Sequence, residues 1–209
     1  MARGDKIALY LPRSAMGERA VFLVGFMASG KSSVGQELAR RLEWDFVDLD
    51  ARIESRERQT VPEIFRDKGE PGFRLAETSA LRDLLTEPLK RSRVVALGGG
   101  AFVQETNREL LRQWPSVFLE ATVPELWQRS LTDGVERPLR EHPEQFAKLY
   151  AERLPFYRQA SVVVETTGKQ LASICVEIES ALQLRGTPED VESGLSRIDV
   201  TGLGTGESH

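Results

Sequence analysis

The sequence has few of the residues that mark disulfide-linked or membrane-spanning proteins. Cys175 is the single cysteine among 209 residues, so no disulfide can form within the chain and a reducing compartment is expected. No apolar run approaches the roughly 20 residues of a transmembrane helix. The run Ile7–Leu11 is shorter than a signal-peptide core of about 7–15 residues. We therefore expect a cytoplasmic protein without membrane attachment.

Charge of one sign is also lacking, because 28 basic residues face 32 acidic ones and the net charge is only −4. This balance gives no reason to expect nucleic acid as a partner. Glycine (17) and proline (10) are too scarce for a collagen-like or low-complexity chain. The chain is long enough for a substantial core, in one large domain or two small ones.

Short apolar runs alternate with helical patterns along most of the chain. This alternation predicts parallel βαβ units in a three-layer α/β/α fold whose central parallel sheet has about five strands. The strands are expected at Val21–Val24, Asp45–Asp50, Val94–Leu97, Ser116–Glu120 and Ser161–Glu165. Helices are expected up to Leu42, at Ala51–Arg58, Val61–Lys68, Pro71–Leu85 and Gln104–Trp114, from Pro124, up to Tyr157, and at Lys169–Leu184.

Local patterns place helix starts and chain ends. A threonine stands three residues before Glu or Gln at three places, and this spacing predicts capping boxes at Thr60–Glu63, Thr122–Glu125 and Thr167–Gln170. Cys175 lies on the apolar stripe of the last helix, which favours a packed thiol, and we expect His142 to be exposed. We divide the chain into an N-terminal extension (1–19), a main domain (20–185) and a disordered tail (186–209).

A phosphate-binding loop is the strongest single motif. Residues 25–32 read GFMASGKS, which matches G-x-x-x-x-G-K-[ST] between a predicted strand and a helix. Backbone N–H groups there point at an anion, and the helix dipole favours negative charge. Lys31 is expected to reach the β- and γ-phosphates of a nucleoside triphosphate, and Ser32 to bind Mg²⁺. Triphosphate contacts are expected from Ala28, Ser29, Gly30, Lys31, Ser32 and Ser33.

The carboxylate that supports the metal must come from an unusual place. The third predicted strand ends in Gly98, where many P-loop proteins carry an acid, and no N-K-x-D signal for guanine is present. Asp48 and Asp50 lie at the end of the second strand, and strand alternation would aim both at the phosphate loop. Two solvated acids at a strand end remain the alternative.

Six motifs in order, from about Val21 to Leu184, resemble the shikimate kinase family of small P-loop kinases. They are GFMASGKSSVG at 25–35, FVDLD at 46–50, IFRDKGEPGFRLAE at 64–77, ALGGGAF at 96–102, ERPL at 136–139 and ERLPFY at 152–157. The resemblance implies transfer of the γ-phosphoryl of ATP to the 3-hydroxyl of shikimate. The product, shikimate 3-phosphate, belongs to the chorismate route to aromatic amino acids.

The resemblance also implies roles for individual side chains. Asp50 would contact the substrate hydroxyls and align or deprotonate the attacking one. Asp48 would support Mg²⁺ beside Ser32. Arg74 and Arg153 would hold the shikimate carboxylate with paired N–H groups.

Further residues follow from the same resemblance. Gly98, Gly99 and Gly100 would let backbone N–H groups approach the substrate. Glu77 would orient Arg74 across one helical turn, a solvated salt bridge being the alternative. Arg137 would enter with a lid at about 130–143 and stabilise the transferring phosphoryl, and Arg129 would stack on adenine.

Three other functions remain open at this point. Gluconate kinase shares the phosphate loop and lid but need not have two arginines with a triple-glycine turn. A nucleoside monophosphate kinase would need a base-binding pocket, for which no signature is evident. A regulatory nucleotide-binding protein would lack Lys31, Asp50 or the arginines, and all are present. We expect a monomer, because one domain carries the whole set of motifs.

Overall fold

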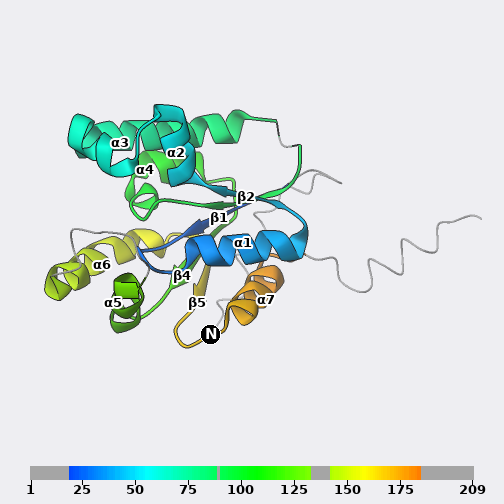
Figure 1. Cartoon of the computed structure of the whole chain (residues 1–209). Coiled ribbons are helices and arrows are strands. Elements are labelled where there is room, and N and C mark those ends of the chain that lie inside the picture. Colours follow the sequence, from blue (N-terminus) through cyan, green and yellow to red (C-terminus); the bar gives the residue numbers. More distant parts are fainter. Residues whose placement is uncertain (1–18, 89, 133–141, 185–209) are drawn as a thin grey trace, which may run out of the picture.

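The computed structural model describes residues 19–88, 90–132 and 142–184. Its centre is a sheet of five parallel strands in the order β2-β3-β1-β4-β5 (Figure 1). The strands are β1 (Ala20–Val24), β2 (Asp45–Asp48), β3 (Arg93–Ala96), β4 (Ser116–Glu120) and β5 (Val162–Glu165). The expected fold class is confirmed, and a strand is present at each of the five expected places, although β2 ends two residues early.

Helices cover both faces of the sheet, which explains why β1 is apolar at every position. Its residues Phe22 and Val24 face one hydrophobic cluster, whereas Val21 and Leu23 face another. The second cluster is closed by α1 (Lys31–Leu42) and α7 (Leu171–Ala181), which lie side by side. The first is closed by α2 (Leu49–Glu57), α3 (Val61–Thr86), η2 (Ala101–Val103), α4 (Glu105–Leu110), α5 (Val123–Thr132) and α6 (Pro143–Tyr157).

The second strand is shorter than expected because Asp48 begins a helix. Its carboxylate Oδ1 accepts hydrogen bonds from Asp50 N at 3.0 Å and Ala51 N at 3.4 Å, which caps α2. Asp50 therefore lies in the first turn of α2, and the expected strand Asp45–Asp50 is wrong in its last two residues. Strand alternation cannot explain how the two acids are placed.

Helix α3 bends where two helices were expected. Gly69 has φ 66° and ψ −179°, a conformation that is open essentially only to glycine, and the helix restarts at Pro71. The capping box at Thr60 is confirmed, because Thr60 Oγ1 accepts from Glu63 N and Glu63 accepts from Thr60 N.

The other two expected capping boxes are wrong. Helix α7 begins at Leu171 after Gln170, which makes no side-chain cap. Thr167 Oγ1 instead accepts from Thr122 N at 3.1 Å. Glu125 Oε1, the expected partner of Thr122 N, accepts from Arg129 and from Gly168 N.

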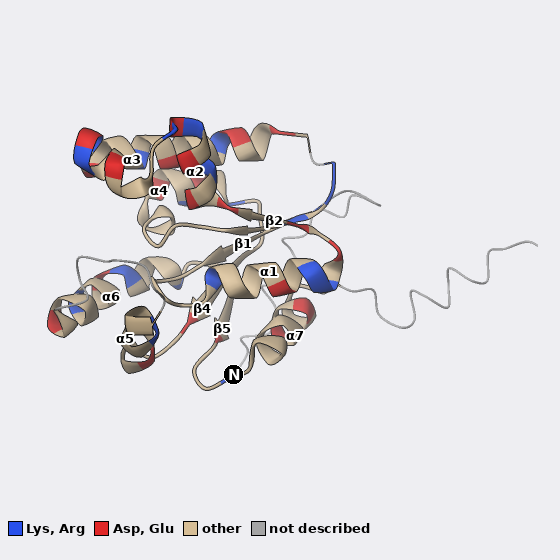
Figure 2. Ribbon diagram, in the orientation of Figure 1, with Lys and Arg blue, Asp and Glu red and all other residues tan. Residues whose placement is uncertain are grey.

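Helices α2 and α3 lie side by side and together carry many charges of both signs (Figure 2). Ion pairs join them at Arg52–Glu87, Arg56–Asp83 and Glu57–Lys68. Exposed pairs of this kind contribute little each. Burial of Leu49, Ile53 and Ile64 in the first core supplies the main attachment, and it fixes the start of α2 against α3.

The remaining structural expectations have mixed outcomes. Cys175 is buried, with Sγ 3.9 Å from Val34 O, and His142 is exposed, as expected. Within the described ranges, no helix is long and apolar enough to cross a bilayer. The N-terminal extension up to residue 18, residues 133–141 of the expected lid, and the expected tail lie outside the described residues.

Candidate active site

The candidate residues gather where parallel strands end. The phosphate loop follows β1, Asp48 ends β2, and Gly98–Gly100 follows β3. The chain leaves β1 toward β2 on one side of the sheet and later returns to β4 on the other. A crevice at such a switch point is the usual ligand site of an open α/β sheet.

The phosphate loop is held in an unusual backbone conformation. Gly30 (φ 87°) is the N-cap of α1, and Ala28 also has a positive φ of 60°. A Cβ on Gly25 would lie 2.8 Å from Ser29 Oγ and 3.0 Å from Leu119 O, so the position requires glycine. Lys31 Nζ donates to Phe26 O at 2.8 Å and to Gly25 O at 3.1 Å. The ammonium therefore lies within the curve of the loop.

Ser32 and Asp48 meet directly. Ser32 Oγ donates to Asp48 Oδ2 at 2.9 Å, while the other carboxylate oxygen caps α2. A hydroxyl and a carboxylate beside a phosphate loop are the oxygen ligands that Mg²⁺ takes together with phosphate and water. Among the described residues, no three acidic, histidine or cysteine side chains are grouped so that they could hold a metal ion by themselves.

Asp50 presents an unsatisfied oxygen to the site. Its Oδ1 is buried and has no hydrogen-bond partner among the described residues. A Cβ on Gly98 would lie 2.6 Å from this oxygen, so the carboxylate lies against the glycine turn. Burial, and next the charge of Asp48, raise the pKa of Asp50. A buried acceptor without a donor is a ready contact for a ligand hydroxyl.

Arg74 is fixed by two glutamates on its own helix. Its Nη1 donates to Glu77 Oε2 at 2.9 Å, and its Nη2 donates to Glu70 Oε1 at 3.1 Å. The guanidinium lies against the glycine turn, because a Cβ on Gly100 would be 2.4 Å from Nη2. Glu77 is 0% exposed, so the expected pairing with Arg74 is confirmed and the solvated alternative is wrong. Burial raises the pKa of Glu77 to about 7, against the attraction of Arg74.

Arg153 reaches the same turn from α6. Its Nη1 donates to Gly99 O at 3.3 Å, and its guanidinium lies 5.8 Å from the centre of the Phe26 ring. Arg74 at Gly100 and Arg153 at Gly99 therefore bring two positive charges to one turn. The structure thus brings together both arginines, Asp50 and the three glycines.

Two residues at this turn were missed by sequence reasoning. Tyr157 donates its hydroxyl to Gly99 O, the oxygen that Arg153 also contacts. Asn107 is buried and donates to Ala101 O at 3.0 Å, which holds η2 after the turn. Tyr157 had a signal, because it stands four residues after Arg153 and hence on the same helical face. Asn107 had none.

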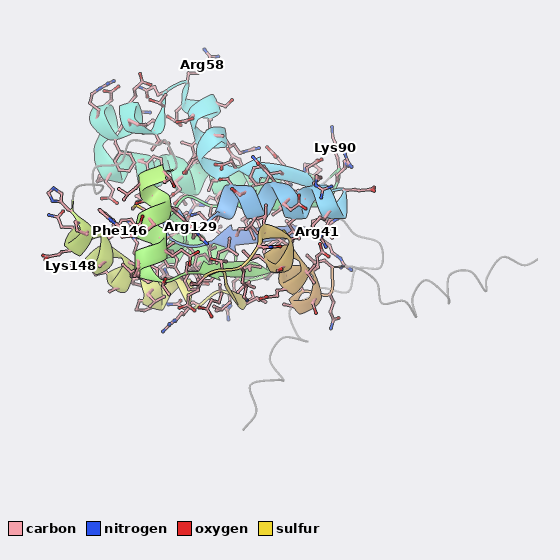
Figure 3. The ribbon with its side chains drawn as sticks, turned by 60° about the horizontal axis from the view of Figure 1, so that its bottom comes forward. Arg41, Arg58, Lys90, Arg129, Phe146 and Lys148 are labelled. Atoms are coloured by element: carbon pink, nitrogen blue, oxygen red, sulfur yellow. The ribbon has the colours of Figure 1, made fainter. Side chains whose placement is uncertain are left out.

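The two other candidate arginines are less informative. Arg129 lies on α5, the helix that packs on α6 through Trp127 and Phe146 (Figure 3). Its Nη2 contacts Glu125 Oε1 at 2.5 Å and Thr166 O at 3.3 Å, and its stacking on adenine stays a prediction. Arg137 lies outside the described residues. Arg158, which the site does not include, pairs with Glu120 at 2.8 Å.

Three features of the site define the class of protein. They are the phosphate loop, the hydroxyl–carboxylate pair beside it and the two arginines around the glycine turn. The anchored lysine fits a triphosphate, and the arginines fit a second, carboxylate-bearing ligand. The fold and site are those of a small P-loop kinase.

Comparison with known proteins narrows this class. The family model described as "SKI: Shikimate kinase" matches residues 27–183. The chain is 43% identical over 171 residues to a shikimate kinase of Geobacter metallireducens, covering 80% of this chain and 93% of that protein. It is 40% identical over 178 residues to a shikimate kinase of Thermus thermophilus, with coverages of 83% and 94%. The chain belongs to the shikimate kinase family.

A solved structure of a relative agrees. The shikimate kinase from Acinetobacter baumannii in complex with shikimate superposes with a TM-score of 0.72 at 35% identity. The match covers 81% of this chain and 96% of that one.

Proposed function

We propose that the protein transfers the γ-phosphoryl of ATP to the 3-hydroxyl of shikimate, giving shikimate 3-phosphate and ADP. The observation that carries this proposal is the meeting of Arg74, Arg153 and Asp50 at one glycine turn. A carboxylate-bearing polyol needs a cationic clamp for the acid and an acceptor for a hydroxyl. Membership of the family and the shikimate complex of the Acinetobacter relative support the same substrate.

Arg74 and Arg153 bind the carboxylate of the substrate. Each guanidinium can offer two parallel N–H donors, which fix the orientation of a carboxylate as well as attract it. The pair of Arg74 with Glu77 holds one fork in place before the substrate arrives. Backbone N–H groups of Gly98–Gly100 complete this side of the site, since no side chain obstructs them.

Asp50 orients the attacking hydroxyl. Its unpartnered Oδ1 accepts the hydroxyl hydrogen, and its raised pKa makes it a better proton acceptor than an ordinary carboxylate. Phosphoryl transfer depends mainly on positioning and on stabilising charge. A hydroxyl held between Asp50 and the arginine clamp meets the first of these needs.

The phosphate loop holds ATP. Lys31 exchanges its carbonyl contacts for phosphate oxygens, and N–H groups of Ala28, Ser29, Gly30 and Ser33 surround them. Ser32 and Asp48 would hold Mg²⁺, which when bound offsets negative charge on the β- and γ-phosphates. Arg129 stacks on adenine, and Arg137 closes over the phosphoryl with the lid at about 130–143.

The experiment that tests this function is ADP release with ATP and Mg²⁺ in the presence of shikimate, gluconate or a nucleoside monophosphate. Strong stimulation by shikimate alone supports the proposal. If gluconate stimulated ADP release, Arg74 and Arg153 would bind the carboxylate of gluconate and not that of shikimate. If ATP bound but no acceptor stimulated ADP release, a regulatory role would be favoured. We further propose a cytoplasmic monomer, because one chain supplies every group; light scattering on a sizing column tests the monomer.

A further inference from the structure

The Gly99 carbonyl oxygen has two donors that come from one helix. Tyr157 donates its hydroxyl to this oxygen, and Arg153 Nη1 donates to it at 3.3 Å. Tyr157 is 0% exposed, and its ring stacks on Phe118 with centroids 5.3 Å apart. The hydroxyl therefore has a fixed position, whereas the guanidinium lies at the edge of the site, where a ligand can draw it away.

We propose that Tyr157 is a positioning residue for the acceptor substrate, which holds the Gly99–Gly100 peptide in place and releases Arg153 for the substrate carboxylate. The inference rests on the proposed function. Tyr157 would contact neither ATP nor shikimate. It would determine how Arg153 and the Gly99–Gly100 peptide are oriented toward the substrate carboxylate.

The first step of the argument concerns the peptide. No described peptide bond is cis, so the N–H of Gly100 points opposite to the C=O of Gly99. Anchoring the carbonyl on Tyr157 therefore aims the Gly100 N–H to the other side of the turn. Among the described residues this N–H has no backbone acceptor, so it can donate to a ligand.

The second step concerns Arg153. A carbonyl oxygen has two lone pairs, so it can accept from both donors. When Arg153 turns to a carboxylate, Gly99 O keeps the bond from Tyr157 and is not left unsatisfied. Without that hydroxyl the oxygen would either retain Arg153 or lose its last donor, and both outcomes weaken substrate binding.

The hydroxyl is a permanent donor. Burial raises the pKa of Tyr157 to about 12, against the attraction of Arg153. The phenol therefore stays protonated at neutral pH, when it can only donate to a carbonyl oxygen.

Tyr157→Phe tests the proposal, because it removes the hydroxyl and keeps the ring on Phe118. We expect the KM for shikimate to rise about 10-fold, the size of effect that a lost buried hydrogen bond produces. The dissociation constant of ATP should stay within about twofold, since the phosphate loop is untouched.

Tyr150→Phe is the matched control. Tyr150 lies on the same helix, is also buried, and donates its hydroxyl to Ala121 O at 3.1 Å, away from the glycine turn. Both variants should lower Tm to a similar extent, but only Tyr157→Phe should raise the KM for shikimate. An unchanged KM, or equal changes in the two variants, would overturn the proposal and leave Tyr157 a packing residue.

Coupling to Arg153 gives a second measurement. If the two side chains act through one oxygen, Tyr157→Phe should raise KM less in an Arg153→Lys background than in the wild type. Equal factors in both backgrounds would contradict the shared oxygen. If a different carboxylate-bearing acceptor, and not shikimate, stimulates ADP release, the proposed function is wrong. The role of Tyr157 is then tested by measuring the KM of that acceptor in the same variants.

Discussion

Asp50 and Glu77 each have one buried carboxylate oxygen that receives no hydrogen bond from the described residues, and both oxygens face Gly98. A Cβ at Gly98 would lie 2.6 Å from Asp50 Oδ1 and 3.0 Å from Glu77 Oε1. Their partners differ, because Glu77 accepts a hydrogen bond from Arg74, whereas no side chain in the described part of the chain donates to Asp50 Oδ1. The two carboxylates thus differ in their partners, and under the proposed function Glu77 positions the arginine while Asp50 contacts the substrate.

Asp50→Asn separates charge from shape. The amide fills the same space but cannot accept a proton, so we expect kcat to fall by about 10²–10⁴. The affinity for ATP, measured by calorimetry, should change little, because the phosphate loop keeps its own contacts. Turnover close to that of the wild type would remove Asp50 from the chemistry.

Gly100→Ala tests the contact between the turn and Arg74. The backbone of Gly100 is right-handed (φ −107°, ψ −10°) and suits alanine, but the new Cβ would be 2.4 Å from Arg74 Nη2. Arg74 must move, so the KM for shikimate should rise about 10-fold or more.

Gly99→Ala is the comparison, because the nearest atom to its Cβ is Met27 N at 3.5 Å, an ordinary contact. Its effect on KM should be smaller. Steady-state kinetics measure both variants, and an unchanged KM in Gly100→Ala would contradict the assigned position of Arg74.

At the scale of elements, α3 places both Arg74 and Glu77 after its kink at Gly69. The sequence predicted separate helices at Val61–Lys68 and Pro71–Leu85, and it predicted the capping box at Thr60, because both depend on neighbours along the chain. It failed at Thr122 and Thr167, which bond to each other across 45 residues. It also failed at Asp50, because the carboxylate of Asp48 starts a helix where strand alternation was expected to continue. In both cases a side chain forms a hydrogen bond that the local sequence pattern does not anticipate, and this bond determines the backbone conformation instead of the pattern.

Gly69→Ala tests the kink. Alanine at φ 66° and ψ −179° costs about 1–3 kcal/mol, and a shift of the helix behind the kink should also raise the KM for shikimate. Gly168→Ala provides the contrast: φ is again 66°, nothing lies within 4 Å of its Cβ, and Arg74 is not on its segment. Urea unfolding and kinetics should show lost stability in both and a changed KM only at Gly69. A normal KM in Gly69→Ala would mean that the kink does not position Arg74.

At the scale of the whole molecule, the alternation of strands and helices was enough to predict the layers and the ends of most strands. The strand order β2-β3-β1-β4-β5 is a property of pairings between distant segments, and no local pattern specifies it. Tyr157 illustrates the same limit within the site, because it contacts Gly99 across 58 residues. Sequence motifs identify which side chains belong to the site. The packing of α6 against the glycine turn determines that Arg153 and Tyr157 donate to the same oxygen, Gly99 O.

Global stability should depend on pH through Glu77. The native state holds this proton up to a pKa of about 7, whereas the ordinary pKa of a glutamate is 4.5. Between these values the native state binds more protons than the unfolded one, so the free energy of unfolding falls as pH rises. The contribution is at most about 3 kcal/mol.

Glu77→Gln removes that titration. Urea unfolding at several values between pH 5 and pH 8 should show a flatter dependence on pH in the variant than in the wild type. Asp50, whose pKa is also raised, stays in both proteins, so the variant keeps the pH dependence that this carboxyl contributes. Parallel curves would show that Glu77 does not carry its proton in the folded protein.

The most direct test of the account is the structure of the product. Nuclear magnetic resonance of the reaction of wild-type protein with ATP, Mg²⁺ and shikimate identifies the oxygen that receives the phosphoryl group. In the proposed geometry the two arginines fix the carboxylate and Asp50 selects one hydroxyl, so we expect shikimate 3-phosphate as the single product. Phosphate on another hydroxyl, a mixture of positions, or ADP formed without phosphorylated shikimate would contradict the assigned geometry.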